Sequence, residues 1–595
     1  METPCVKVDP RFTSLMYNRW LINRTNPEFL QYLSKNASVS PLFAQVLVNR
    51  GFRTASAISD FLSPSISSLT DPFDIPGISS AAFRIGKAVN RGERILVHGD
   101  YDADGVSATA ILCLALRSLG ADCLYFIPDR FAHGYGFQLC GVEKAKAAAA
   151  SLIITVDCGI TSFDAVDAAR RGGIDVIITD HHEPARGMKL ENESSKSQNG
   201  QLSASDALLP DAVAVVNPKV TNAGSAVEHL SGAGVALKLV QALYRERPDD
   251  LLPFFDLGAI GTIADVVPMT GENRIIARTG LSLMNNSGRV GVSALLKVSG
   301  LEGKDLKAGR LAFSIIPRIN AAGRLASSME VVRLLTTDSK DDAAEIAAAL
   351  DKLNAERQRI EEEIFQEAVA KLGEDDASPA IVLSGAGWHE GVIGIVASRI
   401  SDRCSRPAII FSVKNGIAKG SARSVPAFDI CKALSDCREM LISYGGHKQA
   451  AGIKLEAAKL GIFTRRMCEL AASATDAGAA DAGIVIDADV GLSEMNFGLM
   501  KELSMLEPLG LGNPEPLFGA RMLKVHSPKV VGNNHLRMKL CERSCRMDAI
   551  GFGMGGHIDD FDLYGTIDAA FSPSVNEWNG ARYLQLVLKA FRPSA

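Results

Sequence analysis

The clearest pattern in the first half of the chain is an alternation of short apolar runs with stretches of helical spacing. The apolar runs cover residues 95–97, 124–127, 152–156, 176–179 and 213–216. Residues 108–119 read as a helix that closes at Gly120. Strands that alternate with helices are typical of βα units in a parallel sheet. Because the carboxyl ends of such strands share one edge, polar residues that follow them are expected to converge there.

The second half of the chain begins with one long amphipathic pattern. Within residues 341–372, apolar positions recur at helical spacing on a charged background, at Ile346, Leu350, Leu353, Ile360 and Ile364. This pattern predicts a long helix that joins two domains. A second α/β pattern then runs from residue 376 to about 470, and an Ala-, Gly- and Asp-rich linker covers 473–483. The last unit has strand-like runs at 536–540, 548–553 and 583–589, which favour a small β-barrel such as an OB-fold.

These patterns divide the chain into several predicted parts. A length of 595 residues corresponds to three or four domains. We expect a lead-in subdomain at 1–84, an α/β domain at 85–335, a connecting helix at 336–375, a second α/β domain at 376–472 and a barrel at 484–595. Residues 186–209 are rich in Ser, Asn, Gln and Glu, which predicts a surface insertion.

Composition narrows the class of protein but not its substrate. Hydrophobic residues make up 47% of the chain and charged residues 22%, as in soluble globular proteins. We find neither a bilayer-spanning apolar run nor a signal peptide, so we expect a cytosolic protein with no membrane partner. The 11 cysteines form no C-x-x-C pair, which indicates neither a zinc site nor a disulfide framework. A net charge of -5 argues against a wholly basic surface, although a local basic channel remains compatible with it.

The candidate chemistry lies directly after the predicted strands. Four such residues, His98, Asp100, Asp102 and Asp104, fall between the first run and the first helix, and Asp157, Asp180, His181 and His182 follow later strands. A further acid, Asp265, follows another apolar segment. Carboxylates with imidazoles suit Mn²⁺ or Mg²⁺, and this many carboxylates suit two ions that share a bridging Asp. Such a pair of ions indicates phosphoester hydrolysis.

Each of these residues alone has a simpler structural explanation. The Asp- and Gly-rich stretch at 100–105 could be a turn that caps a helix, and Asp157 could be a turn residue. Asp180 could cap a helix, and one of the two histidines could be a buried structural group. The set as a whole, at successive strand ends, favours a metal site.

Several longer motifs make the chain similar to a known family. Asp100-Tyr101-Asp102-Ala103-Asp104-Gly105 and Asp180-His181-His182 resemble the DHH phosphoesterase superfamily. Motifs at 317–324, 388–394, 420–424, 445–452 and 507–516 narrow the resemblance to the bacterial RecJ type of single-strand-specific exonuclease. The resemblance runs from about residue 94 to the C-terminus. It implies an α/β fold class: a parallel-sheet DHH domain, a long helix, a second α/β domain (DHHA1) facing the first across a cleft, and a C-terminal OB-fold-like β-barrel.

The resemblance also implies roles for the candidate site residues. One metal ion would be held by His98, Asp102 and Asp157, and the other by Asp104, Asp157, His181 and Asp265. Asp100 would lie at the edge of this shell, and how ligation divides between His98 and Asp100 is open. Asp180 would orient a neighbouring ligand. His182 would contact the scissile phosphate or the leaving oxygen, as an acid or as a charge stabiliser.

The second α/β domain supplies groups that suit a phosphate backbone. Residues 420–423 offer amides, a hydroxyl and a guanidinium in what reads as a short flexible loop, and 445–447 repeat the theme with His447. By resemblance, Arg130, Ser421 and Arg423 would hold a terminal 5′ phosphate. Other candidate nucleic-acid contacts are Arg318 and Asn320 in the 317–324 motif, and Lys524, Lys529, Arg537, Lys539, Arg543 and Arg546 in the barrel. The alternative is that these loops merely turn and these charges are solvated.

The sequence thus predicts an exonuclease of single-stranded DNA that acts in recombination and repair. It would start at a 5′ end, use two Mn²⁺ or Mg²⁺ ions and release 5′ mononucleotides. The family role adds a single-strand-binding protein and a helicase as expected partners. One alternative is a DHH hydrolase of oligoribonucleotides, cyclic dinucleotides or polyphosphate, although short substrates have no need of the C-terminal extension. Another is a non-catalytic replication scaffold, which predicts eroded ligands, whereas every expected acid and histidine is present.

Overall fold

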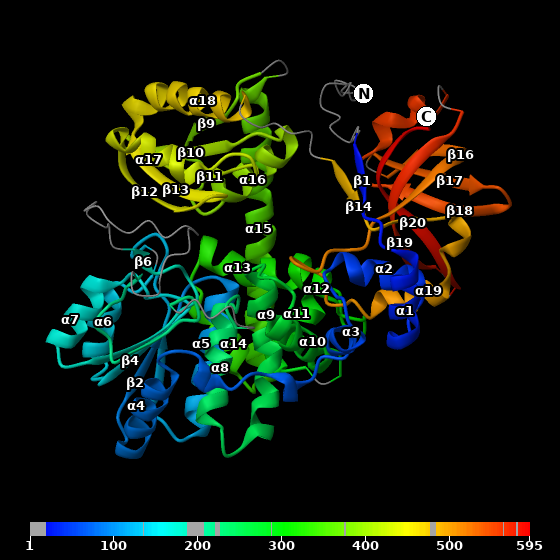
Figure 1. The fold of residues 1–595 in the computed structure, drawn as a ribbon. Coiled ribbons are helices and arrows are strands. Elements are labelled where there is room, and N and C mark those ends of the chain that lie inside the picture. Colours follow the sequence, from blue (N-terminus) through cyan, green and yellow to red (C-terminus); the bar gives the residue numbers. More distant parts are fainter. Residues whose placement is uncertain are drawn as a thin grey trace, which may run out of the picture. The chain divides into compact units, whose positions relative to one another are not determined.

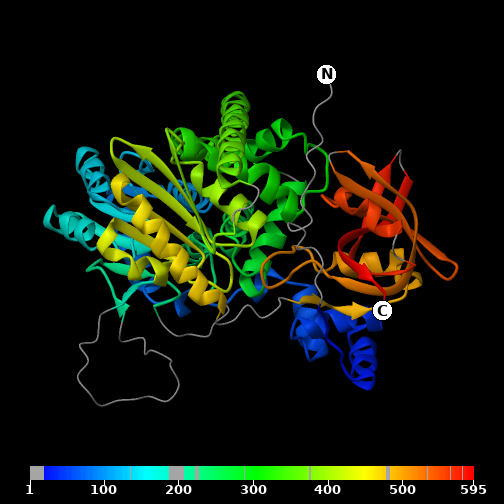
Figure 2. The same cartoon turned by 90° about the horizontal axis from the view of Figure 1, so that it is seen from above.

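The structure is a computed structural model that describes residues 19–594 apart from 135, 187–206, 221–226, 287, 374–376, 477–482, 533, 563–564 and 579–580. Most of the predicted insertion at 186–209 and of the linker at 473–483 therefore lies outside the described residues. Contacts divide the chain into two units (Figures 1 and 2). We call Ser56–Ala355 with Leu506–Pro514 the parallel-sheet unit, and Met1–Ala55, Glu356–Met505 and Glu515–Ala595 the barrel unit.

The parallel-sheet unit is built on five parallel strands. Their order in the sheet is β3 (Cys123–Phe126), β2 (Ile95–His98), β4 (Leu152–Val156), β5 (Asp175–Thr179) and β8 (Ala214–Val216). All five predicted strands are confirmed to within two residues, since buried parallel strands are nearly continuous apolar runs. The chain leaves β2 for β3 on one side and β4 lies on the other, so the strand order reverses at β2 and β4. Ligands bind at such points in open α/β sheets.

Helices cover both faces of this sheet. Helices α6 (Leu139–Ala147) and α7 (Phe163–Arg171) pack on one face through a small apolar cluster. The larger core, on the other face, contains α4 (Ile78–Arg91), α5 (Ala103–Ser118), α8 (Gly232–Leu243) and α9 (Phe255–Ala264). Helix α5 begins five residues before the predicted position, because the Asp102 side chain caps its first turn. The unit is completed by α10 (Gly271–Asn286), α11 (Val290–Val298), α13 (Ile316–Leu325) and α14 (Met329–Thr336).

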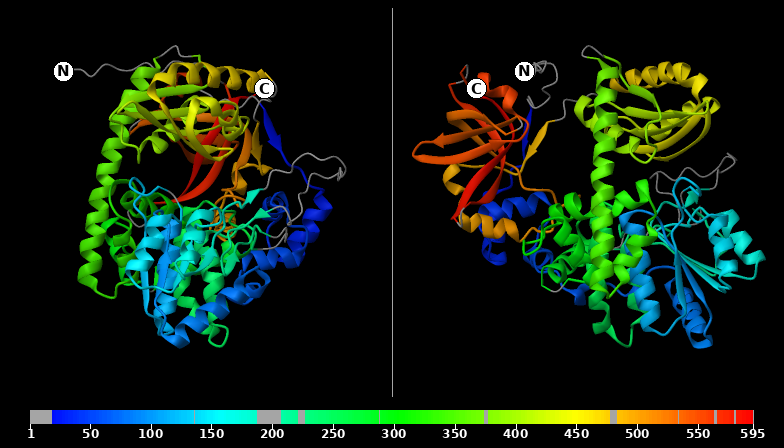
Figure 3. Two further views of the ribbon diagram at one scale, coloured as in Figure 1. Left: turned by 90° about the vertical axis from the view of Figure 1, so that its left-hand side faces the viewer. Right: turned by 180° about the vertical axis from the view of Figure 1, so that it is seen from behind.

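The predicted long helix is confirmed as α15 (Lys340–Leu372), which is unbroken along its length (Figure 3). After it, the barrel unit holds a five-stranded sheet in the order β12 (Leu441–His447), β13 (Ala450–Glu456), β11 (Ile417–Arg423), β10 (Ala408–Lys414) and β9 (Ile381–Ala386). Only β9 and β10 pair in parallel. Helices α16 (Ile393–Cys404), α17 (Ile430–Asp436) and α18 (Leu460–Asp476) pack against this sheet.

The C-terminal strands form the predicted small barrel. The barrel strands are β16 (Phe518–Val531), β17 (His535–Glu542), β18 (Cys545–Gly551), β20 (Ala581–Pro593) and β19 (Ile567–Trp578). Each pairs with the next, and an additional pairing of β16 with β19 closes the ring. Closure removes exposed strand edges. None of the helices in the described ranges combines the length and the apolar character needed to cross a bilayer.

Residues 20–49 pack within the barrel unit, which the sequence did not predict. Strand β1 (Trp20–Ile22) pairs in parallel with β14 (Ile484–Ile486). Ser40, which caps α2 (Pro41–Asn49), donates its backbone N–H to Glu502 in α19 (Phe497–Ser504) at 2.7 Å. Such contacts between distant parts of the chain leave no local pattern in the sequence.

Candidate active site

The turn after β2 is organised by the Asp102 carboxylate. Its Oδ1 accepts hydrogen bonds from the backbone N–H groups of Asp104 and Gly105, both at 3.0 Å. This cap places Asp104 in the first turn of α5. Gly105 allows the turn to close, because a Cβ there would lie 2.7 Å from the Asp100 Cβ. The sequence Asp100-Tyr101-Asp102-Ala103-Asp104-Gly105 is therefore a helix-capping turn that also gathers three carboxylates.

The N-terminus of α8 fixes the Asp104 carboxylate. Its Oδ2 accepts from the Gly232 N–H at 2.6 Å and its Oδ1 from the Ala233 N–H at 2.9 Å. A helix N-terminus carries positive partial charge and stabilises an anion. Gly261 of α9 gives this carboxylate room, since a Cβ there would lie 2.3 Å from Asp104 Oδ1. The contact between Asp104 and α8 was not predicted. Its signal in the sequence is Ser231, which caps the helix N-terminus ahead of Gly-Ala-Gly.

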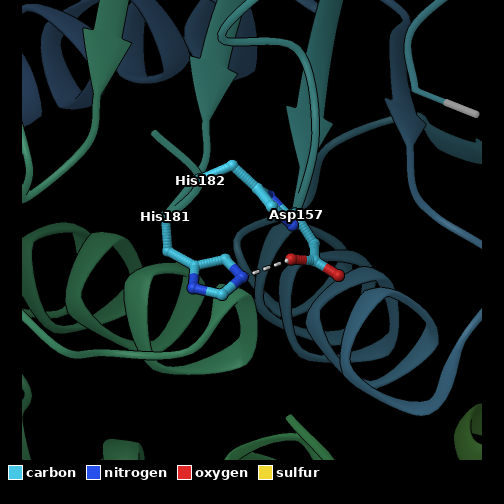
Figure 4. Close-up of side chains that lie close together, drawn as sticks. All are labelled: Asp157, His181 and His182. Atoms are coloured by element: carbon cyan, nitrogen blue, oxygen red, sulfur yellow. Dashed lines mark ion pairs between the residues drawn. The ribbon is translucent and has the colours of Figure 1, made fainter. Parts of the chain in front are cut away.

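Asp157 lies at the centre of the candidate site. It follows β4 in a left-handed backbone conformation, with φ of 61°. Its Oδ1 lies 3.1 Å from Nε2 of His181, which follows β5 (Figure 4). A Cβ at Gly232 would lie 2.5 Å from Asp157 Oδ1, so only glycine fits there. The carboxyl ends of β4 and β5 and the start of α8 therefore meet at this carboxylate.

Asp180 is engaged by hydrogen bonds rather than left open for a metal. It is buried, and it accepts from the backbone N–H groups of Ile160, His181 and His182 at 2.7–3.0 Å. Its Oδ1 also lies 2.7 Å from His182 Nδ1. Burial alone would raise the pKa of Asp180, but the hydrogen bond and charge of His182 lower it overall. Burial opposes protonation of His182 too, yet the bond to Asp180 raises the pKa of this imidazole to about 9.

The structure brings most of the predicted ligands together in three groups of potential metal-binding atoms. Within each group these atoms lie within 4.8 Å of one another: Asp157 with His181 and His182; Asp104 with His181 and Asp265; and Asp100 with Asp102 and Asp157. Among the described residues, His98 falls in none of these groups. It is fully buried, with Nδ1 3.8 Å from Cys158 Sγ.

The electrostatics of these groups fit a divalent cation. Burial, followed by the charge of neighbouring carboxylates, raises the pKa of Asp100, Asp104 and Asp157 well above the usual range. Burial and Asp102 raise the pKa of Asp265 to about 7. Asp100 Oδ1 is buried without a hydrogen-bond partner among the described residues. Converging acids that repel one another, beside an imidazole kept neutral by burial, form a hard donor set suited to Mn²⁺ or Mg²⁺.

Three of the predicted nucleic-acid contacts lie in the same unit. The guanidinium carbon of Arg130 lies 5.1 Å from the centroid of the Tyr101 ring, and this side chain contributes positive charge near Asp100. Asn320 accepts a hydrogen bond from the Ala103 N–H at 2.8 Å, so it supports the turn that carries the acids. Arg318 pairs with Asp351 of α15 at 2.8 Å.

The predicted loop at residues 420–423 is wrong, because these residues are part of strand β11. Ser421 pairs with Ile410 on one side and with Gly452 on the other. The run Gly-Ser-Ala-Arg lacks β-branched residues and so resembles a loop, but its two neighbouring strands supply the pairing. Gly420 faces the core, where a Cβ would lie 2.4 Å from the Phe411 ring. Ser421 and Arg423 point to the opposite face, beside the start of α16 at Gly394.

His447 and the barrel cations are exposed. His447 ends the edge strand β12, so the predicted loop is wrong there as well. The six basic barrel residues are all exposed: Lys524, Lys529, Arg537, Lys539, Arg543 and Arg546. Lys529 of β16 pairs directly opposite Arg537 of β17. Like charges opposite each other are destabilising, so this part of the barrel suits an anionic ligand.

Comparisons with known proteins agree with this architecture along the whole chain. The model of the DHH family N-terminal domain matches residues 94–262, that of the DHHA1 domain 368–473 and that of the RecJ OB domain 486–590. The single-stranded-DNA-specific exonuclease RecJ of Bacillus subtilis is 36% identical over 96% of this chain and 70% of its own length. The Escherichia coli protein of the same name is 33% identical over 94% and 96%.

Solved structures give the same answer. The crystal structure of RecJ from Thermus thermophilus in complex with Mn²⁺ aligns with a TM-score of 0.81 and 33% identity, over 97% of this chain and 80% of that one. The complex of that protein with Mg²⁺ aligns with a TM-score of 0.76. Identity above 30% over nearly the full length, with all three domains in order, decides the assignment. The chain belongs to the RecJ family of single-stranded-DNA-specific exonucleases.

Proposed function

We propose that this exonuclease degrades single-stranded DNA from the 5′ end and releases 5′ mononucleotides by hydrolysis at a two-ion site around Asp157. The observation that carries the proposal is the convergence of three groups of potential ligands, two of which contain Asp157. Two ions supply positive charge that stabilises both the attacking and the leaving oxygen in an in-line displacement at phosphorus. The complete set of acids argues against a non-catalytic scaffold.

The ligand sets can be assigned from this convergence. One ion would be held by Asp157 with Asp100 and Asp102, and the other by Asp104, His181 and Asp265 with Asp157 as the bridge. The geometry favours Asp100 over His98 for the first ion, since His98 is packed between Phe126 and Phe137 at ring-centroid distances of 5.6 and 5.0 Å. We therefore leave His98 out of this proposed ligand set, although its Nε2, like Asp100 Oδ1, is buried without a hydrogen-bond partner among the described residues.

His182 is proposed as the residue that stabilises charge on the scissile phosphate or the leaving oxygen. Asp180 orients the imidazole through Nδ1, and in this proposal Nε2 is the ring nitrogen that faces the substrate. The same carboxylate keeps the ring protonated at neutral pH, since it raises the pKa to about 9. A protonated imidazole can donate a hydrogen bond to a phosphate oxygen and pass a proton to the departing 3′ oxygen.

Substrate polarity is proposed to follow from a bound 5′ phosphate. Ser421 and Arg423 lie beside the N-terminus of α16, where a hydroxyl, a guanidinium and the helix dipole favour a phosphate group. Arg130 offers a second guanidinium on the parallel-sheet unit. A bound terminal phosphate would favour entry of the strand by its 5′ end. His447 and the barrel cations would contact the rest of the strand, and protein partners remain a prediction.

The proposal is tested with single-stranded oligonucleotides blocked at one end by biotin and streptavidin. With Mn²⁺ present, a 3′-blocked strand is expected to yield 5′ mononucleotides, identified by mass spectrometry, whereas a 5′-blocked strand resists degradation. Degradation of the 5′-blocked strand alone would contradict the polarity. Hydrolysis of dinucleotides with neither long strand degraded would favour the short-substrate alternative.

A further inference from the structure

The motif at residues 507–516 has no part in the proposed function so far, yet its position is unusual. Residues Leu506–Pro514, which we call the strap, belong by their contacts to the parallel-sheet unit, whereas the residues on both sides of them belong to the barrel unit. The chain therefore leaves the barrel unit at the strap, packs within the parallel-sheet unit that carries the acids, and then re-enters the barrel unit.

The strap is anchored by two buried side chains. Arg274 of α10 donates Nη1 to the Leu506 carbonyl at 2.7 Å and Nε to the Phe61 carbonyl at 2.9 Å. Asn513, which is fully buried, donates Nδ2 to the carbonyls of Leu506 and Pro508 at 2.7 and 2.9 Å. These bonds hold the strap in one shape, because breaking them would leave buried polar groups unsatisfied.

The strap in turn holds the residues that follow Asp265. The Leu511 carbonyl accepts a hydrogen bond from the buried Met269 N–H at 2.6 Å. A Cβ on Gly510 would touch the Met269 side chain at 3.4 Å, so the two backbones lie close together. Gly512, with φ of 73°, lies similarly close to Pro268. The strap thus packs along the end of the turn that begins at Asp265.

The turn itself needs an outside support. Asp265 ends α9, where its N–H bonds to the Gly261 carbonyl at 3.0 Å. The next residue, Val266, has φ of 55°, which is a costly conformation for a β-branched side chain, and it is 65% exposed. Such a conformation persists only when its surroundings determine it. Asn273 adds to the support, because its Nδ2 donates to the carbonyls of Pro268 and His229 at 3.1 and 2.7 Å.

We propose that the strap is a positioning element for the metal site: by holding Met269, it fixes the strained turn and so the direction of the Asp265 carboxylate. Asn513 and Arg274 are positioning residues in this scheme, since they act through the strap and touch neither metal nor substrate. The inference deepens the proposed function and rests on Asp265 being a ligand. It predicts that loosening the strap weakens metal binding before it weakens DNA binding.

The test compares three variants of the full-length protein: Asp265→Asn, Asn513→Ser and Lys307→Ala. Lys307 is the matched control, because it pairs with Glu507 of the strap at 3.3 Å but is half exposed. Binding of Mn²⁺ without DNA is followed from the electron paramagnetic resonance signal of the free ion. Asn513→Ser is expected to raise the Mn²⁺ dissociation constant about 10-fold, the usual scale for supporting residues, and Lys307→Ala to leave it unchanged.

Kinetics supply the second readout. For Asn513→Ser, kcat is expected to fall at low Mn²⁺ and to recover at saturating Mn²⁺, with KM for the DNA strand unchanged. If Asn513→Ser lowers only the melting temperature and binds Mn²⁺ normally while Asp265→Asn does not, the positioning role is wrong and the proposed function stands. If Asp265→Asn also binds Mn²⁺ normally, the ligand assignment itself fails. Should Asn513→Ser not fold, Gly512→Ala, which strains the strap backbone, is judged by the same criteria.

Discussion

The acid cluster around Asp157 and the face of β11 that carries Ser421 and Arg423 differ in charge and in burial. The acids are buried and repel one another, so their pKa values are raised, and a bound cation would offset this repulsion. Ser421 and Arg423 are only half-buried beside a helix N-terminus, where an anion can bind without disturbing the hydrophobic core. In the proposed function, the first region would perform the chemistry and the second would hold the substrate. Variants of the first should change kcat, and variants of the second should change KM.

The largest effect is expected from Asp104→Asn. This substitution replaces the carboxylate by an amide, which removes the negative charge of a proposed metal ligand. It also turns an N–H group toward the backbone N–H donors of Gly232 and Ala233 at the start of α8. Loss of charge stabilisation worth several kcal/mol corresponds to a fall in kcat of roughly 10³-fold. Steady-state kinetics at saturating strand would measure it, with Asp164→Ala, an exposed acid of α7, as the control. A rise in KM with unchanged kcat would instead place Asp104 outside the chemistry.

A smaller effect, also on the acid cluster around Asp157, is expected from Asp180→Asn. The amide cannot stabilise the His182 imidazolium, so the pKa of His182 should drop from about 9 and the ring should lose its fixed orientation. A loss of about 100-fold in kcat is expected, typical of a misplaced proton donor. Mn²⁺ affinity should stay within a few-fold of the unchanged protein. A large loss of Mn²⁺ binding would show that Asp180 is itself a ligand.

On the other side of the comparison, Arg423→Lys should act on substrate binding. A lysine keeps the charge but cannot form the planar, forked contacts that a guanidinium makes with phosphate. We expect KM for a 5′-phosphorylated strand to rise about 10-fold, with little change for a strand that ends in a 5′ hydroxyl. Arg466→Lys, on the exposed side of α18, is the matched control. An equal change in KM for the two strands would contradict a role of Arg423 in binding the 5′ phosphate.

The smallest effect concerns stability without metal. Because the folded-state pKa of Asp265 is raised to about 7 from 3.8, the folded protein holds this proton more tightly than the unfolded chain does. In the presence of a chelator, the contribution of Asp265 to the free energy of unfolding should therefore be greatest below about pH 4. It should decline as the pH rises toward 7. Thermal unfolding at pH 5.5 and 7.5 should show a decline of a few degrees that is reduced in Asp265→Asn and reversed by Mn²⁺.

The same two regions show what a sequence can predict. The acids were found because buried parallel strands are continuous apolar runs, and the polar residues after them share an edge. The pattern at residues 420–423 predicts a loop, whereas these residues belong to a strand that is formed by pairing with its neighbours rather than by its own side chains. The start of α5 was missed because Asp102 acts both as a candidate ligand and as a cap.

Contacts that join distant segments were beyond prediction. Nothing near Asp265 in the sequence indicates that a carbonyl of Leu511 holds the turn after it. The proposed division of roles between His98 and Asp100 likewise rests on the packing of His98 between two phenylalanines. Local patterns thus identify the acids and the strands, while the supports of the site come from tertiary packing.

The most direct test of the central claim follows a single strand with a 5′ phosphate and a 3′ label in the presence of Mn²⁺. The intact protein and Asp164→Ala are expected to release nucleotides from the 5′ end, while Asp157→Ala, though folded, should leave the strand intact. Equal activity in Asp157→Ala would contradict the account, because Asp157 is the proposed bridge between the two ligand sets.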